Sequence, residues 1–167
     1  MNLRYQPKDG YVADIYPYFW DGKYHLFYSK PAIGSTGLDR SLVDWEHIVS
    51  NNLTDWEELP TAIKRGKRPS SPDYHGVWCG SAFEKDGVFH IFYTGFNRNS
   101  EIPQTICHAT SNDLINWEKD PNNPLLKPDS RWYELKDWRD PFVFYNKEKD
   151  LYYMILGARV NSGPKLR

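Results

Sequence analysis

Hydrophobic and polar positions alternate along three segments of the chain, and a short polar turn interrupts each segment. In 14–28 and 79–93, aromatic and β-branched residues flank the pairs Asp21-Gly22 and Asp86-Gly87. An Asp-Gly pair in such a setting is a strong signal for a tight turn between antiparallel strands. Residues 140–155 repeat the pattern with a longer turn. The sequence therefore predicts three β-hairpins.

A second repeated element follows the first two hairpins. The strand-like runs 45–49 and 105–110 lead into two similar polar turns that begin at Ser50 and Ser111, after which Trp56 and Trp117 begin another strand. Together with the hairpin, this gives four short antiparallel strands in a unit of roughly 60–65 residues, which is the blade of a β-propeller. The absence of helical periodicity argues against a helical repeat.

The predicted fold class is all-β, a partial β-propeller of about two and a half blades, each a four-stranded antiparallel sheet. We expect residues 1–167 to form one propeller domain with blade 1 at about 11–63, blade 2 at about 76–128 and the start of blade 3 at about 137–160, while 161–167 form a loop. Because ring closure protects the edges of a propeller, the chain is expected to be a fragment or to be completed by a second chain. Its open blade edges make a homo-oligomer a further expectation.

Composition narrows the class of function. A net charge of -1 and a pI of about 6.5 lack the basic excess typical of nucleic-acid binding, and no apolar run approaches the ~20 residues needed to span a membrane. Residues 1–10 lack the apolar core of a signal peptide, so we expect a cytoplasmic protein, or a secreted one whose leader has been removed. The 2 Cys and 5 His show no metal-ligand spacing, and we predict no metal or organic cofactor. An aromatic content of 16% suits strands and platforms for sugar rings.

Two carboxylates hold the same position in different hairpins. Aligning the second strands of the hairpins places Asp14 and Asp140 at equivalent points, with Cys79 at that point in the hairpin between them. Equivalent positions at the start of first strands surround one end of a propeller channel, and paired carboxylates perform glycoside hydrolysis. Arg139 beside Asp140 is suited to hold a sugar hydroxyl. Since successive strand residues face opposite sides, this requires a bend, which Pro141 favours.

Several segments carry a family resemblance. Trp138-Arg-Asp-Pro-Phe-Val-Phe144 resembles the Arg-Asp-Pro motif of the β-fructosidases, the levanase and invertase family of glycoside hydrolase family 32 type. The stretches 78–82 and 92–95 resemble the Trp-Ser-Gly-Ser and Tyr-Thr-Gly segments of that family, and 45–50 with 55–60 resembles its Trp-x-His-x-x-Ser and His-Trp-x-x-Leu-Pro segments. The matches follow one another in order along most of the chain.

The resemblance implies a five-bladed propeller that binds a carbohydrate substrate and cleaves β-fructofuranosidic bonds in sucrose-like or fructan oligosaccharides with retention. By it, Asp14 is the nucleophile, Asp140 with Arg139 holds the sugar and stabilises the transition state, and Trp78 and Ser81 contact the substrate. Ile15 follows Asp14 where the family commonly has Pro, which indicates a divergent branch. The family's acid/base is a Glu in a Glu-Cys pair; this sequence has no such pair, so we expect the isolated chain to be inactive or nearly so.

Two alternatives stay open. Related five-bladed families cleave arabinosides, xylosides or mannosides, often with inversion, and a carboxyl separation of about 5–5.5 Å or about 6.5–9.5 Å distinguishes retention from inversion. The chain could also be a non-catalytic carbohydrate-binding or self-associating module. Each candidate residue also has a structural interpretation: Asp14 as the cap of a turn, Arg139 and Asp140 as an ion pair, and Trp78 as a packing residue.

Overall fold

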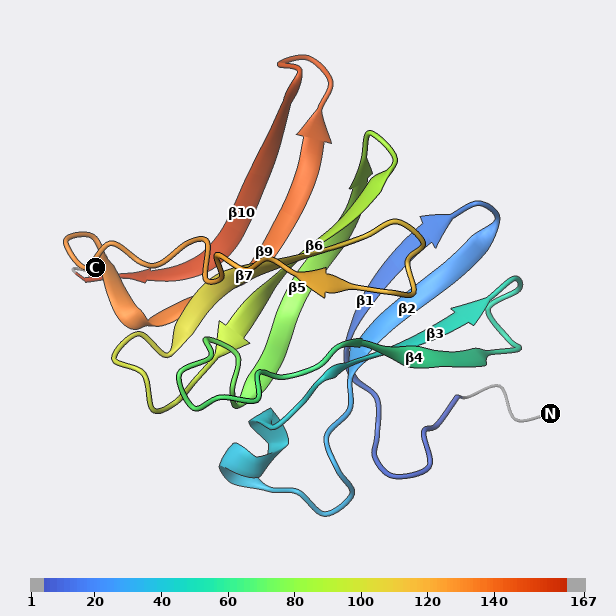
Figure 1. Cartoon of the computed structure of the whole chain (residues 1–167), viewed down its shortest axis with the longest axis horizontal. Helices are drawn as coiled ribbons and strands as arrows, with labels where there is room; N and C mark the ends of the chain where they lie inside the picture. The colour runs from blue at the N-terminus through green and yellow to red at the C-terminus, as the bar shows by residue number, and fades with distance from the viewer. Residues whose placement is uncertain (1–4, 162–167) are drawn as a thin grey trace, which may run out of the picture.

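The computed structural model describes residues 5–161, which form three antiparallel sheets (Figure 1). The first sheet contains β1 (Ala13–Trp20), β2 (Lys23–Ser29), β3 (Trp45–Ser50) and β4 (Glu57–Ile63). The second contains β5 (Gly76–Lys85), β6 (Val88–Phe96), β7 (Gln104–Ser111) and β8 (Glu118–Lys119), and the third pairs β9 (Tyr133–Asn146) with β10 (Leu151–Val160). A short 3-10 helix, η1 (Gly37–Ser41), joins β2 to β3. Within the described range no helix has the length and apolar character to cross a membrane.

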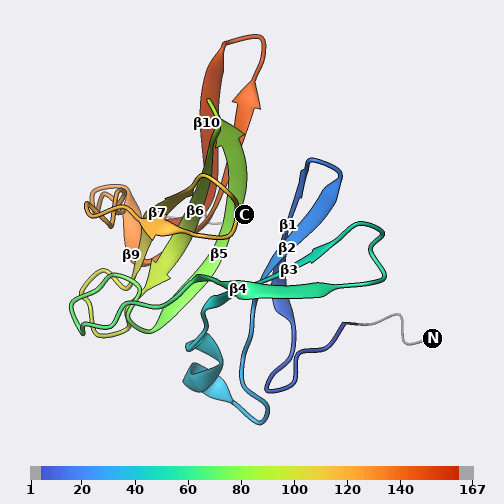
Figure 2. The same ribbon diagram turned by 45° about the vertical axis from the view of Figure 1, so that its right-hand side comes forward.

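The predicted partial propeller is confirmed. Two four-stranded sheets, each with its strands in chain order, precede a single hairpin, and Figures 1 and 2 show the three sheets following one another around a common side. The first strands pack in succession, since β1 contacts β5 and β5 contacts β9. The first strands of the three sheets are therefore neighbours. Residues 162–167, predicted to be loop, lie outside the described range.

The two Asp-Gly turns form as the sequence predicts. Asp21 and Gly22 have φ values of 46° and 74°, and Asp86 and Gly87 have φ values of 54° and 82°. Positive φ at both central residues defines the two-residue turn whose twist matches paired antiparallel strands. Asp150, with φ of 52°, lies in the longer turn of the third hairpin. Asp tolerates this conformation better than most residues.

The polar turns that close β3–β4 and β7–β8 are copies of each other. The side chain of Asn52 accepts hydrogen bonds from the backbone N–H groups two and three residues later, and Asp113 does the same in the second sheet. Leu53 and Leu114, the residues that follow, both have φ of 63°. Such side-chain acceptors stabilise a turn locally, so the same sequence pattern gives the same backbone in both blades.

The main hydrophobic core lies between the first and second sheets. Its buried members are Phe27, Trp45, Ala62 and Ile63 from the first sheet with Val77, Phe89, Ile91, Tyr93, Cys107, Ala109 and Leu114 from the second sheet and its turn. Tyr16 of β1 stacks on Trp45 with ring centroids 4.3 Å apart. The indole Nε1 of Trp45 donates to the carbonyl oxygen of Trp78 at 3.0 Å. This packing ties β1 to the start of β5.

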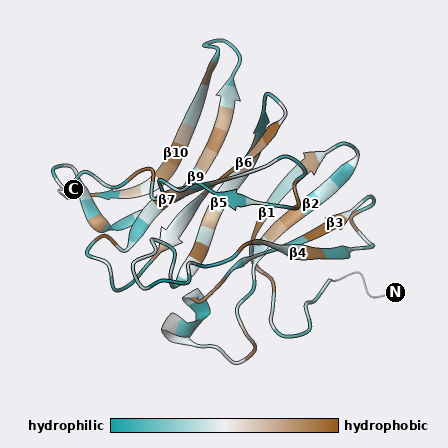
Figure 3. Cartoon of the chain, viewed as in Figure 1, coloured by the Kyte–Doolittle hydropathy of each residue, from teal (hydrophilic) through white to brown (hydrophobic). Residues whose placement is uncertain are grey.

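Hydrophobic residues lie along β9 and β10 (Figure 3), and several of their side chains are exposed in the described part of the chain. Phe142 and Ile155, paired across β9 and β10, are 54% and 59% exposed. Beyond β10, no strand continues the sheet within residues 5–161. Open edges and apolar faces favour pairing with another strand or sheet. Self-association through them stays a prediction.

Two histidine pairs occupy the same position in the first two sheets. Nδ1 of His25 lies 2.9 Å from Nε2 of His47, and Nδ1 of His90 lies 3.0 Å from Nε2 of His108. The other nitrogen of His108 faces Asp120 at 3.3 Å, whereas Nδ1 of His47 is buried without a hydrogen-bond partner among the described residues. Burial lowers the pKa of His47 to about 3. These pairs belong to the blade framework.

We expect the free energy of unfolding to fall as the pH falls below about 6.5. His47 takes up a proton at about pH 3 when folded but near 6.5 when unfolded, so the unfolded state binds more protons between these values. The resulting loss is up to about 1.4 kcal/mol for each pH unit. Urea unfolding between pH 7 and 5 measures it. The fall should shrink in His47→Gln and persist in the matched variant His108→Gln, and equal falls in both variants would contradict the assignment.

Candidate active site

Asp14 and Asp140 lie at equivalent bulges of their hairpins, Asp14 next to the start of β1 and Asp140 midway along β9. Their φ values are 43° and 61°, and the strand register shifts between Ala13 and Ile15 in one hairpin and opposite Asp140 in the other. A bulge re-aims a side chain, and Asp is among the few non-glycine residues that adopt positive φ readily. Both side chains are exposed. Two equivalent carboxylates are thus open to a ligand.

Cys79 lies between the two carboxylates. It occupies the corresponding bulge of the second hairpin, where the register shifts between Val77 and Gly80. Burial, with further contributions from the negative charges of Asp140 and Asp14, raises the pKa of Cys79 to about 11, so the thiol stays protonated. Since β1 packs against β5 and β5 against β9, the three bulges lie on neighbouring strands. A Cβ on Gly80 would lie 2.0 Å from a backbone oxygen of β6, which explains the glycine in this segment.

Arg139 and Asp140 face each other although they are consecutive in β9. Nε of Arg139 lies 3.5 Å from Oδ2 of Asp140. The positive φ of Asp140 bends the strand here, which is the bend predicted for two consecutive residues that share one site. The guanidinium also donates to Oδ1 of Asp137 at 2.6 Å and to Oε1 of Gln104 at 3.2 Å. The side chain of Arg139 is 39% exposed. Three oxygen acceptors therefore orient a cation that a sugar hydroxyl can still reach.

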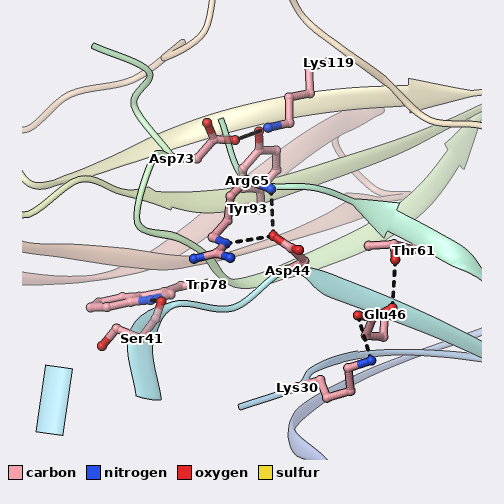
Figure 4. Close-up of polar contacts among 10 residues, drawn as sticks. All are labelled: Lys30, Ser41, Asp44, Glu46, Thr61, Arg65, Asp73, Trp78, Tyr93 and Lys119. Atoms are coloured by element: carbon pink, nitrogen blue, oxygen red, sulfur yellow. Dashed lines mark hydrogen bonds and ion pairs between the residues drawn. The ribbon is translucent and has the colours of Figure 1, made fainter. Parts of the chain in front are cut away.

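Trp78 and Ser81 make their contacts within the protein. Nε1 of Trp78 donates to the carbonyl oxygen of Ser41 at 3.3 Å (Figure 4), and its ring stacks on Phe96 with centroids 4.0 Å apart. The buried hydroxyl of Ser81 accepts the N–H of Val143 at 2.9 Å. Ser81 thus turns toward β9. The predicted roles of both residues as substrate contacts remain predictions.

The connection that leads into β5 is fixed by polar contacts (Figure 4). Asp73, 2% exposed, accepts the hydroxyl proton of Tyr93 at 2.9 Å and forms an ion pair with Lys119 of β8. Arg65, which follows β4, pairs with Asp44 at 3.1 Å. These contacts hold the loops at the end of the sheets where the carboxylates lie. Within residues 5–161 there is no cluster of three or more His, Cys, Asp or Glu side chains arranged to hold a metal ion.

Two further residues contact the Arg-Asp-Pro segment but were not among the predicted site residues. Thr94 bonds to the backbone of Asp140, and Gln104 bonds to Trp138 and to the side chain of Arg139. Thr94 lies within the Tyr-Thr-Gly segment, which is the one sequence signal that points to it. Nothing in the local sequence singles out Gln104. Both residues act across the boundary between the second and third sheets.

Comparison with known proteins gives a consistent result. The family described as glycosyl hydrolases family 32 N-terminal domain matches residues 4–166. The vacuolar acid β-fructofuranosidase 4 of Arabidopsis thaliana is 32% identical over 95% of this chain and 24% of its own length. A sucrose-6-phosphate hydrolase of Pediococcus pentosaceus is 30% identical over 97% of this chain and 31% of its own length.

Solved structures agree with these relatives. The crystal structure of fructan 1-exohydrolase IIa from Cichorium intybus matches 93% of this chain and 29% of its own with a TM-score of 0.76 and 27% identity. The chain thus spans between about a quarter and a third of the length of the proteins it matches.

Proposed function

Because the chain belongs to the glycosyl hydrolase family 32 N-terminal domain family, we propose that the protein cleaves β-fructofuranosidic bonds of sucrose-like or fructan oligosaccharides with retention. The observation that carries this proposal is that two exposed carboxylates, Asp14 and Asp140, occupy equivalent positive-φ bulges on the first strands of separate sheets, and that both strands pack against β5. The names of two similar proteins, a β-fructofuranosidase and a fructan 1-exohydrolase, support a fructosyl unit as the sugar that is transferred.

In the proposed reaction, a carboxylate oxygen of Asp14 attacks the anomeric carbon of the fructosyl unit. The bond from that carbon to the leaving oxygen breaks, and the leaving oxygen keeps the electron pair and takes a proton from a general acid. Water then attacks the same carbon, a general base removes its proton, and fructose is released with Asp14 restored. Asp140 and Arg139 bind sugar hydroxyls, and the charge of Asp140 stabilises the cationic transition state.

The general acid is expected from outside the described residues. Glu57 and Glu58 belong to β4, and Glu118 belongs to β8. These are the last strands of their sheets, while Asp14 and Asp140 lie on first strands. An acid must be within hydrogen-bond reach of the leaving oxygen. The proposed reaction needs three carboxylates, and this chain supplies two of them, Asp14 and Asp140.

An aryl fructoside tests the proposal on the chain itself. A nitrophenyl leaving group needs little help from an acid, whereas the attack of water still needs a base. We therefore expect nitrophenyl β-D-fructofuranoside to leave a stable ester that raises the intact mass by one hexosyl residue, with peptide mapping placing it on Asp14. The matched probes are nitrophenyl α-L-arabinofuranoside and β-D-xyloside. Preferential labelling by a pentoside, a label on another carboxylate, or no label would each contradict the proposal.

The compartment and the assembly state stay predictions. One relative is named as vacuolar, and the expected location of this chain, cytoplasmic or secreted after removal of a leader, stays a prediction. Any homo-oligomer would use the open edge of β10 and the apolar face around Phe142.

A further inference from the structure

Three backbone N–H groups of β9 donate to buried side-chain oxygens of the second sheet. The N–H of Trp138 donates to Oε1 of Gln104 at 3.2 Å, that of Asp140 to Oγ1 of Thr94 at 2.8 Å and that of Val143 to Oγ of Ser81 at 2.9 Å. Thr94, Ser81 and Gln104 are 0%, 6% and 8% exposed. In the described part of the chain β9 has a partner strand only on its β10 side. These oxygens therefore satisfy groups that the strand ladder leaves open.

The hydroxyl of Thr94 is the central member of the three. It accepts the N–H of Asp140 and donates its own proton to the carbonyl oxygen of Cys79 at 3.1 Å. A hydroxyl has one proton to donate, so its orientation is fixed by this pair of bonds. Thr94 therefore connects the bulge that carries Asp140 directly to the bulge that carries Cys79.

The conformation of Asp140 gives this bond its importance. A φ of 61° lies in a region that Asp tolerates better than most residues but still adopts less often than the usual backbone conformations, so the bonds of its backbone help to hold it there. Without an acceptor, the N–H of Asp140 would be unsatisfied against a fully buried neighbour, which favours relaxation of the bulge. Relaxation would separate the carboxylate of Asp140 from Arg139.

We propose that Thr94 is a positioning residue for the reaction: its hydroxyl holds Asp140 in the bulged conformation and so places the Asp140–Arg139 pair at the sugar. This inference rests on the proposed function for its effect on rate. The hydrogen bond from the N–H of Asp140 to the hydroxyl of Thr94 does not depend on which sugar binds.

The first test is the rate of labelling by nitrophenyl β-D-fructofuranoside. Thr94→Val keeps the shape of the side chain and removes the hydroxyl, and we expect the saturating rate to fall about 10²-fold with a smaller change in the half-saturating concentration. Thr94→Ser restores the hydroxyl and should recover most of the rate. The matched control is Thr105→Val, since Oγ1 of Thr105 is buried without a partner among the described residues, and its rate should equal that of the wild type.

The second test is hydrogen exchange of the Asp140 amide, measured by NMR. Exchange should be faster in Thr94→Val than in the wild type, Thr94→Ser and Thr105→Val. Unchanged exchange, or a wild-type labelling rate in Thr94→Val, would overturn the inference. A wild-type chain that is not labelled would contradict the proposed function, and the exchange rates would then still decide whether Thr94 holds Asp140.

Discussion

The variant Asp14→Asn is expected to lose fructosyl transfer to the chain, with the labelling rate falling on the order of 10⁴-fold or more. A carboxamide does not attack the anomeric carbon, so no ester forms. Asn is the suitable replacement because Asp14 has φ of 43°, and Asn, like Asp, accepts positive φ. The backbone of β1 should therefore be preserved. Intact mass followed over time after addition of nitrophenyl β-D-fructofuranoside measures the rate.

A matched control exists at the other end of β1. Asp21 has φ of 46° in the turn that follows the strand, so Asp21→Asn makes the same chemical change in the same backbone conformation. It should be labelled at the wild-type rate. Wild-type labelling of Asp14→Asn would show that another group is the nucleophile.

The variant Asp140→Asn should lower the labelling rate about 10²–10³-fold while the label still forms on Asp14. The substitution removes the charge that we propose stabilises the transition state. It leaves the backbone N–H that bonds to Thr94, and Arg139 is still held by Asp137 at 2.6 Å. The loss therefore reports the carboxylate rather than a change of fold. The same mass assay measures it, with thermal unfolding as a check on the fold.

Two controls separate a direct role from an indirect one. Asp150→Asn changes a turn residue with φ of 52° and should have no effect on the rate. Asp137→Asn removes the bond that orients Arg139 but retains Asp140, and it should cost less than Asp140→Asn. Equal losses in Asp137→Asn and Asp140→Asn would mean that Asp140 acts only through Arg139.

The repeated parts of the fold could be predicted from the sequence because they follow from local chemistry. Asp-Gly pairs set the two tight turns, and the Ser50 and Ser111 segments set matching polar turns. The alternation of hydrophobic and polar positions indicated the strands, and the short turns between them indicated which strands pair. The equivalence of Asp14 and Asp140 was predicted by counting residues along aligned hairpins. In the structure both residues have positive φ, as expected for equivalent positions.

The contacts between sheets could not be predicted in the same way. Thr94 and Gln104 bond to the backbone of β9 from residues more than thirty positions away, and such bonds leave no periodic trace in a sequence. The side chain of Ser81 was placed by resemblance at a sugar, whereas its hydroxyl accepts a bond from Val143. β8 is also only two residues long, although the turn before it matches the turn before β4.

The strand order of the sheets has a consequence for how the protein is made. Each strand within a sheet pairs with the strand synthesised just before it, so a sheet can assemble soon after its own residues leave the ribosome, without waiting for distant partners. The carboxylate pair is different, because Asp14 and Asp140 come from the first and third sheets. A growing chain whose β9 is still inside the ribosome would hold two assembled sheets and only Asp14 of the two carboxylates. We therefore expect the first two sheets to fold before the two carboxylates are brought onto neighbouring strands.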